Sequence, residues 1–166
     1  MHHEIERKYL IRPLSDGFLR APPGCEVWEI DQTYLLAPLG ETHRVRRIVE
    51  NGTERFRLTV KRRLSDLTSE EDEREIARER YESLLAEANP ELQTIRKTRY
   101  RVPHEGQVAE FDRYPFWSDR MILEIELDSE AEAARVPDWV EVIRDVTADP
   151  RYKNVHLAAQ VPLDEI

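Results

Sequence analysis

The chain has 166 residues, 36% of them charged, and its 34 acidic and 25 basic side chains give a formal net charge of −9 at pH 7. Globular proteins average about 25% charged residues, so the chain carries more ions than a solvated surface requires. It has no apolar run of about 18 residues and opens with charge rather than a signal-peptide core. The single cysteine, Cys25, excludes an intrachain disulfide and a cysteine-cluster zinc site. We therefore expect a cytoplasmic protein with no membrane and no nucleic-acid partner.

The dominant pattern along the chain is alternation with a period of two, which is typical of β-strands. In the first such segment, Glu4, Glu6 and Lys8 fall on one face. The Asn51-Gly52 pair further on predicts a tight hairpin. Eight strand candidates result, at 4–10, 32–36, 44–46, 57–61, 71–76, 97–102, 110–112 and 122–127. The gaps between them are mostly too short for crossover helices, which predicts an antiparallel arrangement.

Helices are fewer. Residues 77–88 are rich in helix formers, and a capping-box pattern predicts a short helix over 129–134. Near the end, Asp149 resembles an N-cap with Pro150 at the first helical position. No repeat, low-complexity tract or linker divides the chain, so we expect one domain covering residues 1–166.

The alternating charges have two interpretations: a sheet with one face in water, or a closed barrel with the charged face inside. Two features favour the barrel. Charges on one strand face are often of one sign, and few helices are available to cover a large apolar face. The inward set would then contain eight carboxylates (Glu4, Glu6, Glu73, Glu75, Glu110, Asp112, Glu124 and Glu126) and eight bases (Lys8, Arg44, Arg46, Arg57, Lys61, Lys97, Arg99 and Arg101). Because unpaired buried charges are costly, such an interior predicts a polyanion bound by the bases and divalent cations held by the carboxylates.

The order of these motifs resembles the CYTH domain, the triphosphate tunnel metalloenzyme superfamily. Residues 4–8, Glu-Ile-Glu-Arg-Lys, are similar to its N-terminal Glu-x-Glu-x-Lys signature. Six strand motifs follow in the family's order, at 44–46, 59–61, 73–75, 97–100, 110–112 and 124–126. The resemblance extends from about residue 2 to 162. It implies an α+β fold: an eight-stranded antiparallel β-barrel, or tunnel, with a few helices packed outside and a C-terminal plug helix that carries a substrate-binding lysine.

The resemblance also implies roles for individual residues. The ligands of two Mg²⁺ or Mn²⁺ ions per active site would be Glu4, Glu6, Asp112, Glu124 and Glu126. The phosphate-binding residues would be Lys8, Arg44, Arg46, Lys61, Lys97, Arg99 and Lys153. Lys8 or Lys153 would orient the attacking water or steady the leaving group. Glu73, Glu75 and Glu110 stay open between metal contact and ion pairing with arginines, while Arg57 and Arg101 match no motif position and would be rim contacts or surface charge.

The function implied is metal-dependent hydrolysis of a triphosphate, with inorganic tripolyphosphate, split into pyrophosphate and phosphate, as the first choice. The chain start and the segment 147–154 are similar to the short bacterial branch associated with that substrate. The family also includes thiamine triphosphatases and class IV adenylate cyclases, so these, a nucleoside triphosphatase and a noncatalytic polyphosphate- or nucleotide-binding module stay open. A homodimer is consistent with the resemblance. Trp28, Trp117 and Trp139 are expected to pack outside the barrel.

Overall fold

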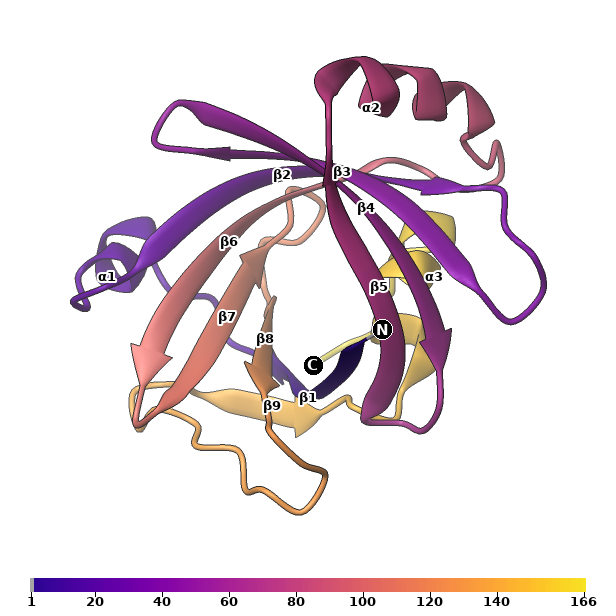
Figure 1. Ribbon diagram of the computed structural model, residues 1–166. Coiled ribbons are helices and arrows are strands. Elements are labelled where there is room, and N and C mark those ends of the chain that lie inside the picture. The colour runs from indigo at the N-terminus through magenta and orange to yellow at the C-terminus, as the bar shows by residue number, and fades with distance from the viewer. Residues whose placement is uncertain (1) are drawn as a thin grey trace.

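A single antiparallel sheet closes on itself in the computed structural model, which describes residues 2–166 (Figure 1). The strand order is β5-β4-β3-β2-β6-β7-β8-β1, and β1 pairs back with β5. These strands are β1 (His2–Ile11), β2 (Glu26–Leu35), β3 (Thr42–Glu50), β4 (Thr53–Arg63), β5 (Thr68–Ile76), β6 (Ile95–His104), β7 (Gln107–Arg113) and β8 (Met121–Glu126). The predicted eight-stranded antiparallel barrel is confirmed.

The structure adds an element that the alternation did not predict. A short strand, β9 (Val142–Asp145), pairs antiparallel with the last residues of β1. β1 thus pairs with β5 through its first residues and with β9 through its last. The predicted hairpin is confirmed at the turn between β3 and β4, where Asn51 and Gly52 both have positive φ angles.

The helices are short: α1 (Asp16–Arg20), α2 (Arg78–Leu84) continued by the 3₁₀ turn η1 (Leu85–Glu87), the 3₁₀ turn η2 (Pro150–Tyr152) and α3 (Asn154–Ala159). The helix predicted over 77–88 is confirmed as α2 and η1, and α1 was not predicted. The C-terminal helix begins as expected, with the Asp149 carboxylate accepting a hydrogen bond from the Arg151 backbone N–H, but an extended Lys153 divides it in two. No helix of residues 2–166 is long and apolar enough to cross a membrane.

The helix predicted over 129–134 was wrong, since the segment forms turns. The carboxylate of Glu132 accepts hydrogen bonds from the Asp128 backbone N–H and from the Gln107 side chain on β7. Glu132, the glutamate of the predicted capping box, therefore holds a loop against the barrel. A loop with its own side-chain hydrogen bonds competes with helix formation.

The outside of the barrel carries apolar side chains that α1, α2 and the loops cover. α2 places Tyr81 against Val45 of β3 and Phe56 of β4. On the opposite wall, Leu19 of α1 and the loop residue Val140 pack over Phe111 of β7 and its neighbours. Alternation along each strand then sends the charged side chains inward.

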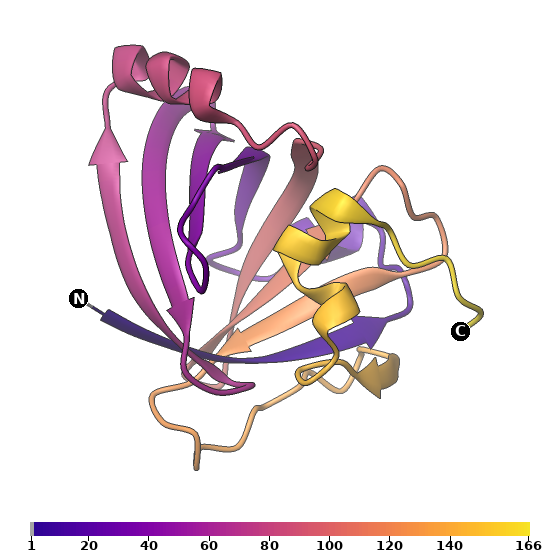
Figure 2. The same cartoon turned by 90° about the vertical axis from the view of Figure 1, so that its right-hand side faces the viewer.

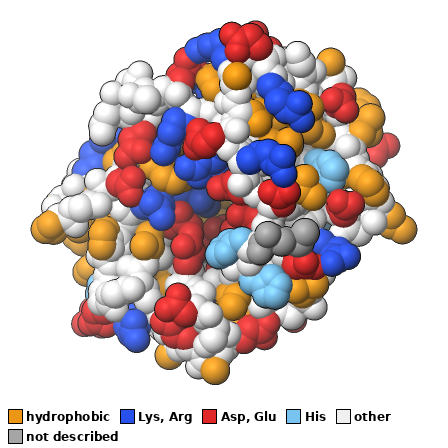
Figure 3. Space-filling view, viewed as in Figure 1, with side chains coloured by type: hydrophobic (Ala, Val, Ile, Leu, Met, Phe, Trp, Pro, Cys, Tyr) orange, Lys and Arg blue, Asp and Glu red, His pale blue; other side chains and the backbone are white. Residues whose placement is uncertain are grey.

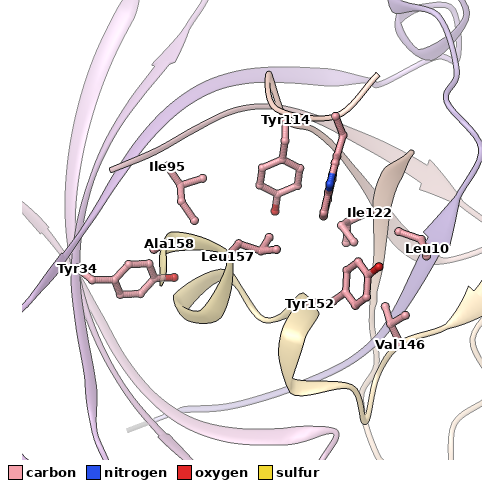
Figure 4. Packing of buried hydrophobic residues seen from close by; sticks show 10 residues of the cluster. Leu10, Tyr34, Ile95, Tyr114, Ile122, Val146, Tyr152, Leu157 and Ala158 are labelled. Atoms are coloured by element: carbon pink, nitrogen blue, oxygen red, sulfur yellow. The ribbon is translucent and has the colours of Figure 1, made fainter. Parts of the chain in front are cut away.

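One end of the barrel interior is apolar and filled by the C-terminal segment. Leu10, Tyr34 and Ile122 share strand faces with inward charged residues and lie together at one end of the barrel. Leu157 and Ala158 of α3 pack against them inside the curve of the strands (Figure 4). Figure 2 shows η2 and α3 on that side of the barrel. The C-terminal segment closes this end, as the predicted plug does, and the interior is reached from the other end.

The plug depends on apolar packing, which gives a direct test. Leu157 is 3% exposed, so Leu157→Ala should lower the free energy of unfolding by about 2–5 kcal/mol through lost burial and the resulting cavity. Urea denaturation checks this value. Leu163→Ala, at a side chain that is 77% exposed, is the matched control and should change it by less than about 0.5 kcal/mol. Equal losses in the two variants would contradict the plug.

Candidate functional site

A cavity of about 970 Å³ occupies the barrel interior. Figure 3 looks into a hollow where Lys and Arg side chains gather on one side and Asp and Glu side chains on the other. Bases come chiefly from β3, β4 and β6, and carboxylates from β1, β5, β7 and β8. The predicted residues that line the cavity are Glu4, Glu6, Lys8, Arg44, Arg46, Arg57, Lys61, Glu73, Arg99, Arg101, Glu110, Glu124, Glu126 and Lys153.

Lys97 and Asp112 are not among the lining residues, nor is Glu75. The Lys97 and Asp112 side chains are 1% and 0% exposed, and Lys97 Nζ lies 3.0 Å from Asp112 Oδ2. Arg99 donates from Nε and Nη2 to the two oxygens of Asp112, each at 2.8 Å. Although burial alone would raise the Asp112 pKa, Arg99 and Lys97 lower it. Burial lowers the pKa of Lys97 to about 8. The pair forms a buried ion cluster that orients Arg99 toward the cavity.

Two lysines project toward the cavity near the plug. Lys8 Nζ lies 3.3 Å from Glu124 Oε1 and donates to the carbonyl oxygen of Tyr152 in η2 at 3.2 Å. Lys153 Nζ donates to the carbonyl oxygen of Thr147 at 3.2 Å. Burial, with the neighbouring charges of Arg63 and Lys8, lowers the pKa of Lys153 to about 8. The break between η2 and α3 therefore positions both lysines. Lys8 is held by its hydrogen bond to the Tyr152 carbonyl oxygen, and Lys153 is itself the residue at the break.

The basic wall contains donors that the protein itself does not use. Arg44 and Arg46 are adjacent inward residues of β3, and both are buried. Arg46 Nη2 donates to Glu73 at 2.8 Å, while the Nε atoms of both arginines are buried without a hydrogen-bond partner within residues 2–166. Burial and the charge of Arg44 lower the pKa of Arg46 to about 10. Desolvated donors that lack partners favour an anionic ligand.

The acidic wall is crowded with carboxylates. Glu4 accepts a hydrogen bond from Lys61 at 2.7 Å, and although burial would raise its pKa, Lys61 holds it well below its usual value. Burial and the charges of Glu124 and Glu4 raise the pKa of Glu6 well above its usual value. Burial and Glu110 raise the pKa of Glu126 to about 7. The wall is therefore short of positive charge at Glu6 and Glu126.

The donor set of this wall fits a hard divalent cation. No three Asp, Glu, His or Cys side chains within residues 2–166 are already grouped as metal ligands. The Oε1 atom of Glu124 and the Oε2 atom of Glu71 are nevertheless buried without a hydrogen bond, with only a lysine Nζ nearby at 3.3 and 3.5 Å. The charges of Glu124 and Glu4 also act on Glu6. Carboxylate oxygens are the ligands that Mg²⁺ and Mn²⁺ prefer, and a cation here would relieve the crowding.

Glu71 and Trp28 are among the cavity residues that the sequence analysis did not predict. Glu71 has the same strand parity as Glu73, so the alternation contained the signal for it. Trp28 was expected outside the barrel, which was wrong, because β2 begins at Glu26 rather than at residue 32. The longer strand puts Trp28 on the inward face shared with Gln32.

Comparisons with known proteins agree with this geometry. No family model matches the sequence. An inorganic triphosphatase of Nitrosomonas europaea is 35% identical over 164 residues, covering 96% of this chain and 99% of the relative. An inorganic triphosphatase of Acetivibrio thermocellus is 30% identical over 169 residues, covering 95% of this chain and 94% of the relative. A crystal structure of an inorganic triphosphatase aligns with a TM-score of 0.59 and 30% identity, covering 98% of each chain.

The buried ion cluster makes a second testable element. Arg99→Ala removes the bidentate partner of the fully buried Asp112, and breaking such a pair costs about 3–5 kcal/mol of stability. Urea denaturation measures the loss, and Arg96→Ala, at a side chain that is 78% exposed, is the control. In Arg99→Ala we also expect the pKa of Asp112 to rise, because Arg99 lowers it in the wild type. NMR titration measures this rise. An unchanged Asp112 pKa together with wild-type stability would refute the cluster's role.

Proposed function

The chain belongs to the inorganic triphosphatase family, and from that premise we propose that it hydrolyses inorganic tripolyphosphate to pyrophosphate and phosphate inside the barrel. One observation carries the proposal at this site. Arginine and lysine donors converge, partly unpaired, on an enclosed cavity whose facing wall is made of carboxylates. Phosphoryl transfer demands mainly positioning and charge neutralisation, which such a cavity supplies.

The basic wall would hold the phosphate chain. Arg44 and Arg46 supply forked donors that match phosphate oxygens, Lys61 supplies a compact charge, and Arg99 would add the N–H groups that Asp112 does not use. Lys97 and Asp112 would act from behind the wall by fixing Arg99. In this assignment Asp112 anchors two bases, because both of its oxygens already accept hydrogen bonds from them.

The acidic wall would hold Mg²⁺ or Mn²⁺ through Glu4, Glu6, Glu124 and Glu126. When bound there, the cations would offset the charge of the phosphate oxygens and lower the pKa of a water molecule. Glu73 and Glu110, which are paired with arginines, would stay as partners of the basic side chains.

Lys153 and Lys8, near the plug, would have different roles in the reaction. With its pKa near 8, Lys153 is suited to accept a proton from the attacking water, since an efficient base titrates close to the working pH. Lys8, which pairs with Glu124, would bind an oxygen of the departing phosphate. The Tyr152 carbonyl group, which accepts a hydrogen bond from Lys8, fixes the position of that lysine relative to the plug.

Tripolyphosphate fits this cavity better than a nucleotide or thiamine triphosphate. An organic base needs an exposed aromatic face on which to stack. The aromatic ring of Trp28 lines the cavity, but guanidinium groups lie over it and the residue is 6% exposed. A bare phosphate chain needs no such surface.

A panel of tripolyphosphate, ATP, GTP and thiamine triphosphate, each with Mg²⁺, Mn²⁺ or Ca²⁺, tests the function by product identity. We expect fastest phosphate release from tripolyphosphate with Mg²⁺ or Mn²⁺, and loss of activity with a chelator. Glu4→Gln and Arg46→Ala should each lower kcat/KM by about 10²-fold or more, which corresponds to about 2.7 kcal/mol. Arg74→Ala, on a side chain that is 64% exposed, is the control.

Two results of that panel would overturn the proposal. Cyclic AMP as the main product from ATP would indicate a cyclase. Tight, metal-dependent binding of every triphosphate without turnover would indicate a binding module.

A further inference from the structure

Trp28 lies at the opposite end of the cavity from the plug. It precedes Tyr34, against which the plug packs, by six positions on β2, or about 20 Å of strand. Three guanidinium groups surround its ring: the Cζ atoms of Arg101, Arg55 and Arg57 are 4.8, 4.9 and 5.5 Å from the ring centroid. Of the three, Arg57 and Arg101 line the cavity and Arg55 does not.

Carboxylates hold each cavity-lining guanidinium group while leaving part of it free. Arg57 donates from Nε to Glu75 at 3.1 Å and from Nη1 to Glu73 at 3.2 Å. Arg101 donates from Nε to Glu110 at 3.0 Å and from Nη1 to Glu26 at 2.9 Å. Neither Nη2 group has a hydrogen-bond partner in the described part of the chain. Both groups are oriented before any ligand arrives.

The indole N–H of Trp28 supplies a third unused donor. Its Nε1 atom is buried and has no hydrogen-bond partner among residues 2–166. Leaving such a group unsatisfied costs about 1–3 kcal/mol, so native structures rarely do so without a reason. The residue lines the cavity, and an acceptor bound there would satisfy the group.

These donors continue the basic wall toward the open end. In the strand register, Arg57 lies directly opposite Arg46, and Trp28 lies directly opposite Arg99. Arg101 is the next inward residue of β6 beyond Arg99. A phosphate chain held by Arg46 and Arg99 therefore has Arg57 and Trp28 beside it on the neighbouring strands and Arg101 beyond it, toward the open end.

We propose that the Trp28 indole N–H, Arg57 and Arg101 form an outer phosphate subsite, which binds the phosphate of an inorganic polyphosphate chain that lies nearest the open end. The inference rests on the proposed function only for the identity of the chain. At the inner wall, Lys61 exchanges its carboxylate partner Glu4 for phosphate. At the outer subsite the ion pairs stay intact, because the donors that bind the phosphate are the unused ones.

The subsite predicts a dependence on chain length that binding measurements can test without turnover. Isothermal titration measures the binding of tripolyphosphate and of pyrophosphate to the metal-free full chain. Tripolyphosphate is long enough to reach the subsite, whereas pyrophosphate is held by the inner wall alone. Trp28→Phe keeps an aromatic ring for the guanidinium groups but removes the N–H. Arg101→Gln removes a guanidinium group that lines the cavity. Arg55→Gln removes one that touches the same ring but does not line the cavity.

We expect Trp28→Phe and Arg101→Gln each to weaken tripolyphosphate binding about tenfold, the equivalent of about 1.4 kcal/mol, and pyrophosphate binding less than about twofold. Arg55→Gln should leave both affinities unchanged, and thermal unfolding of each variant reports on the fold. Equal losses for the two ligands, equal losses in Arg55→Gln, or no loss in any variant would overturn the subsite. This binding pattern without hydrolysis would refute the proposed function and keep the subsite.

Discussion

Ion pairs buried inside a closed barrel are the interaction on which the rest of this structure depends. Without a ligand, the two walls neutralise each other through contacts such as Lys61 with Glu4 and Arg46 with Glu73. A phosphate chain that occupies the bases leaves carboxylates without partners, and buried unpaired charge costs several kcal/mol. In the proposed function, divalent cations would balance those carboxylates. Polyphosphate and metal binding would then be coupled, and by linkage each would favour the other.

The barrel would strengthen this coupling because it encloses the charges. Closure of β1 onto β5 removes free sheet edges, and the apolar plug around Leu157 seals one end. Charges in such an enclosed interior interact more strongly than on a surface. The plug also belongs to the site, because the Tyr152 carbonyl group accepts a hydrogen bond from Lys8 and the following residue is Lys153. Packing and chemistry therefore share one segment.

Strand parity explains how much of this the sequence could predict. A period of two assigns Glu4, Arg46 and Glu124 to inward faces wherever the strands begin, so the barrel and most of the cavity lining followed from it. The alternation does not show how deeply an inward side chain is buried. Lys97 and Asp112 therefore could not be distinguished from residues that reach the cavity. The alternation also does not mark where a strand starts, so Trp28 was misplaced. The turn at 129–134 depends on a contact with Gln107, distant in sequence, that no local pattern contains.

The coupling is tested most directly by a crystal structure of the full chain with tripolyphosphate and Mn²⁺, using anomalous scattering to locate the metal. The account predicts Mn²⁺ against Glu4, Glu6, Glu124 or Glu126, phosphates on Arg44, Arg46 and Lys61, and the Lys61–Glu4 contact broken. Mn²⁺ bound only to phosphate oxygens, with that contact intact and the carboxylates unoccupied, would contradict it.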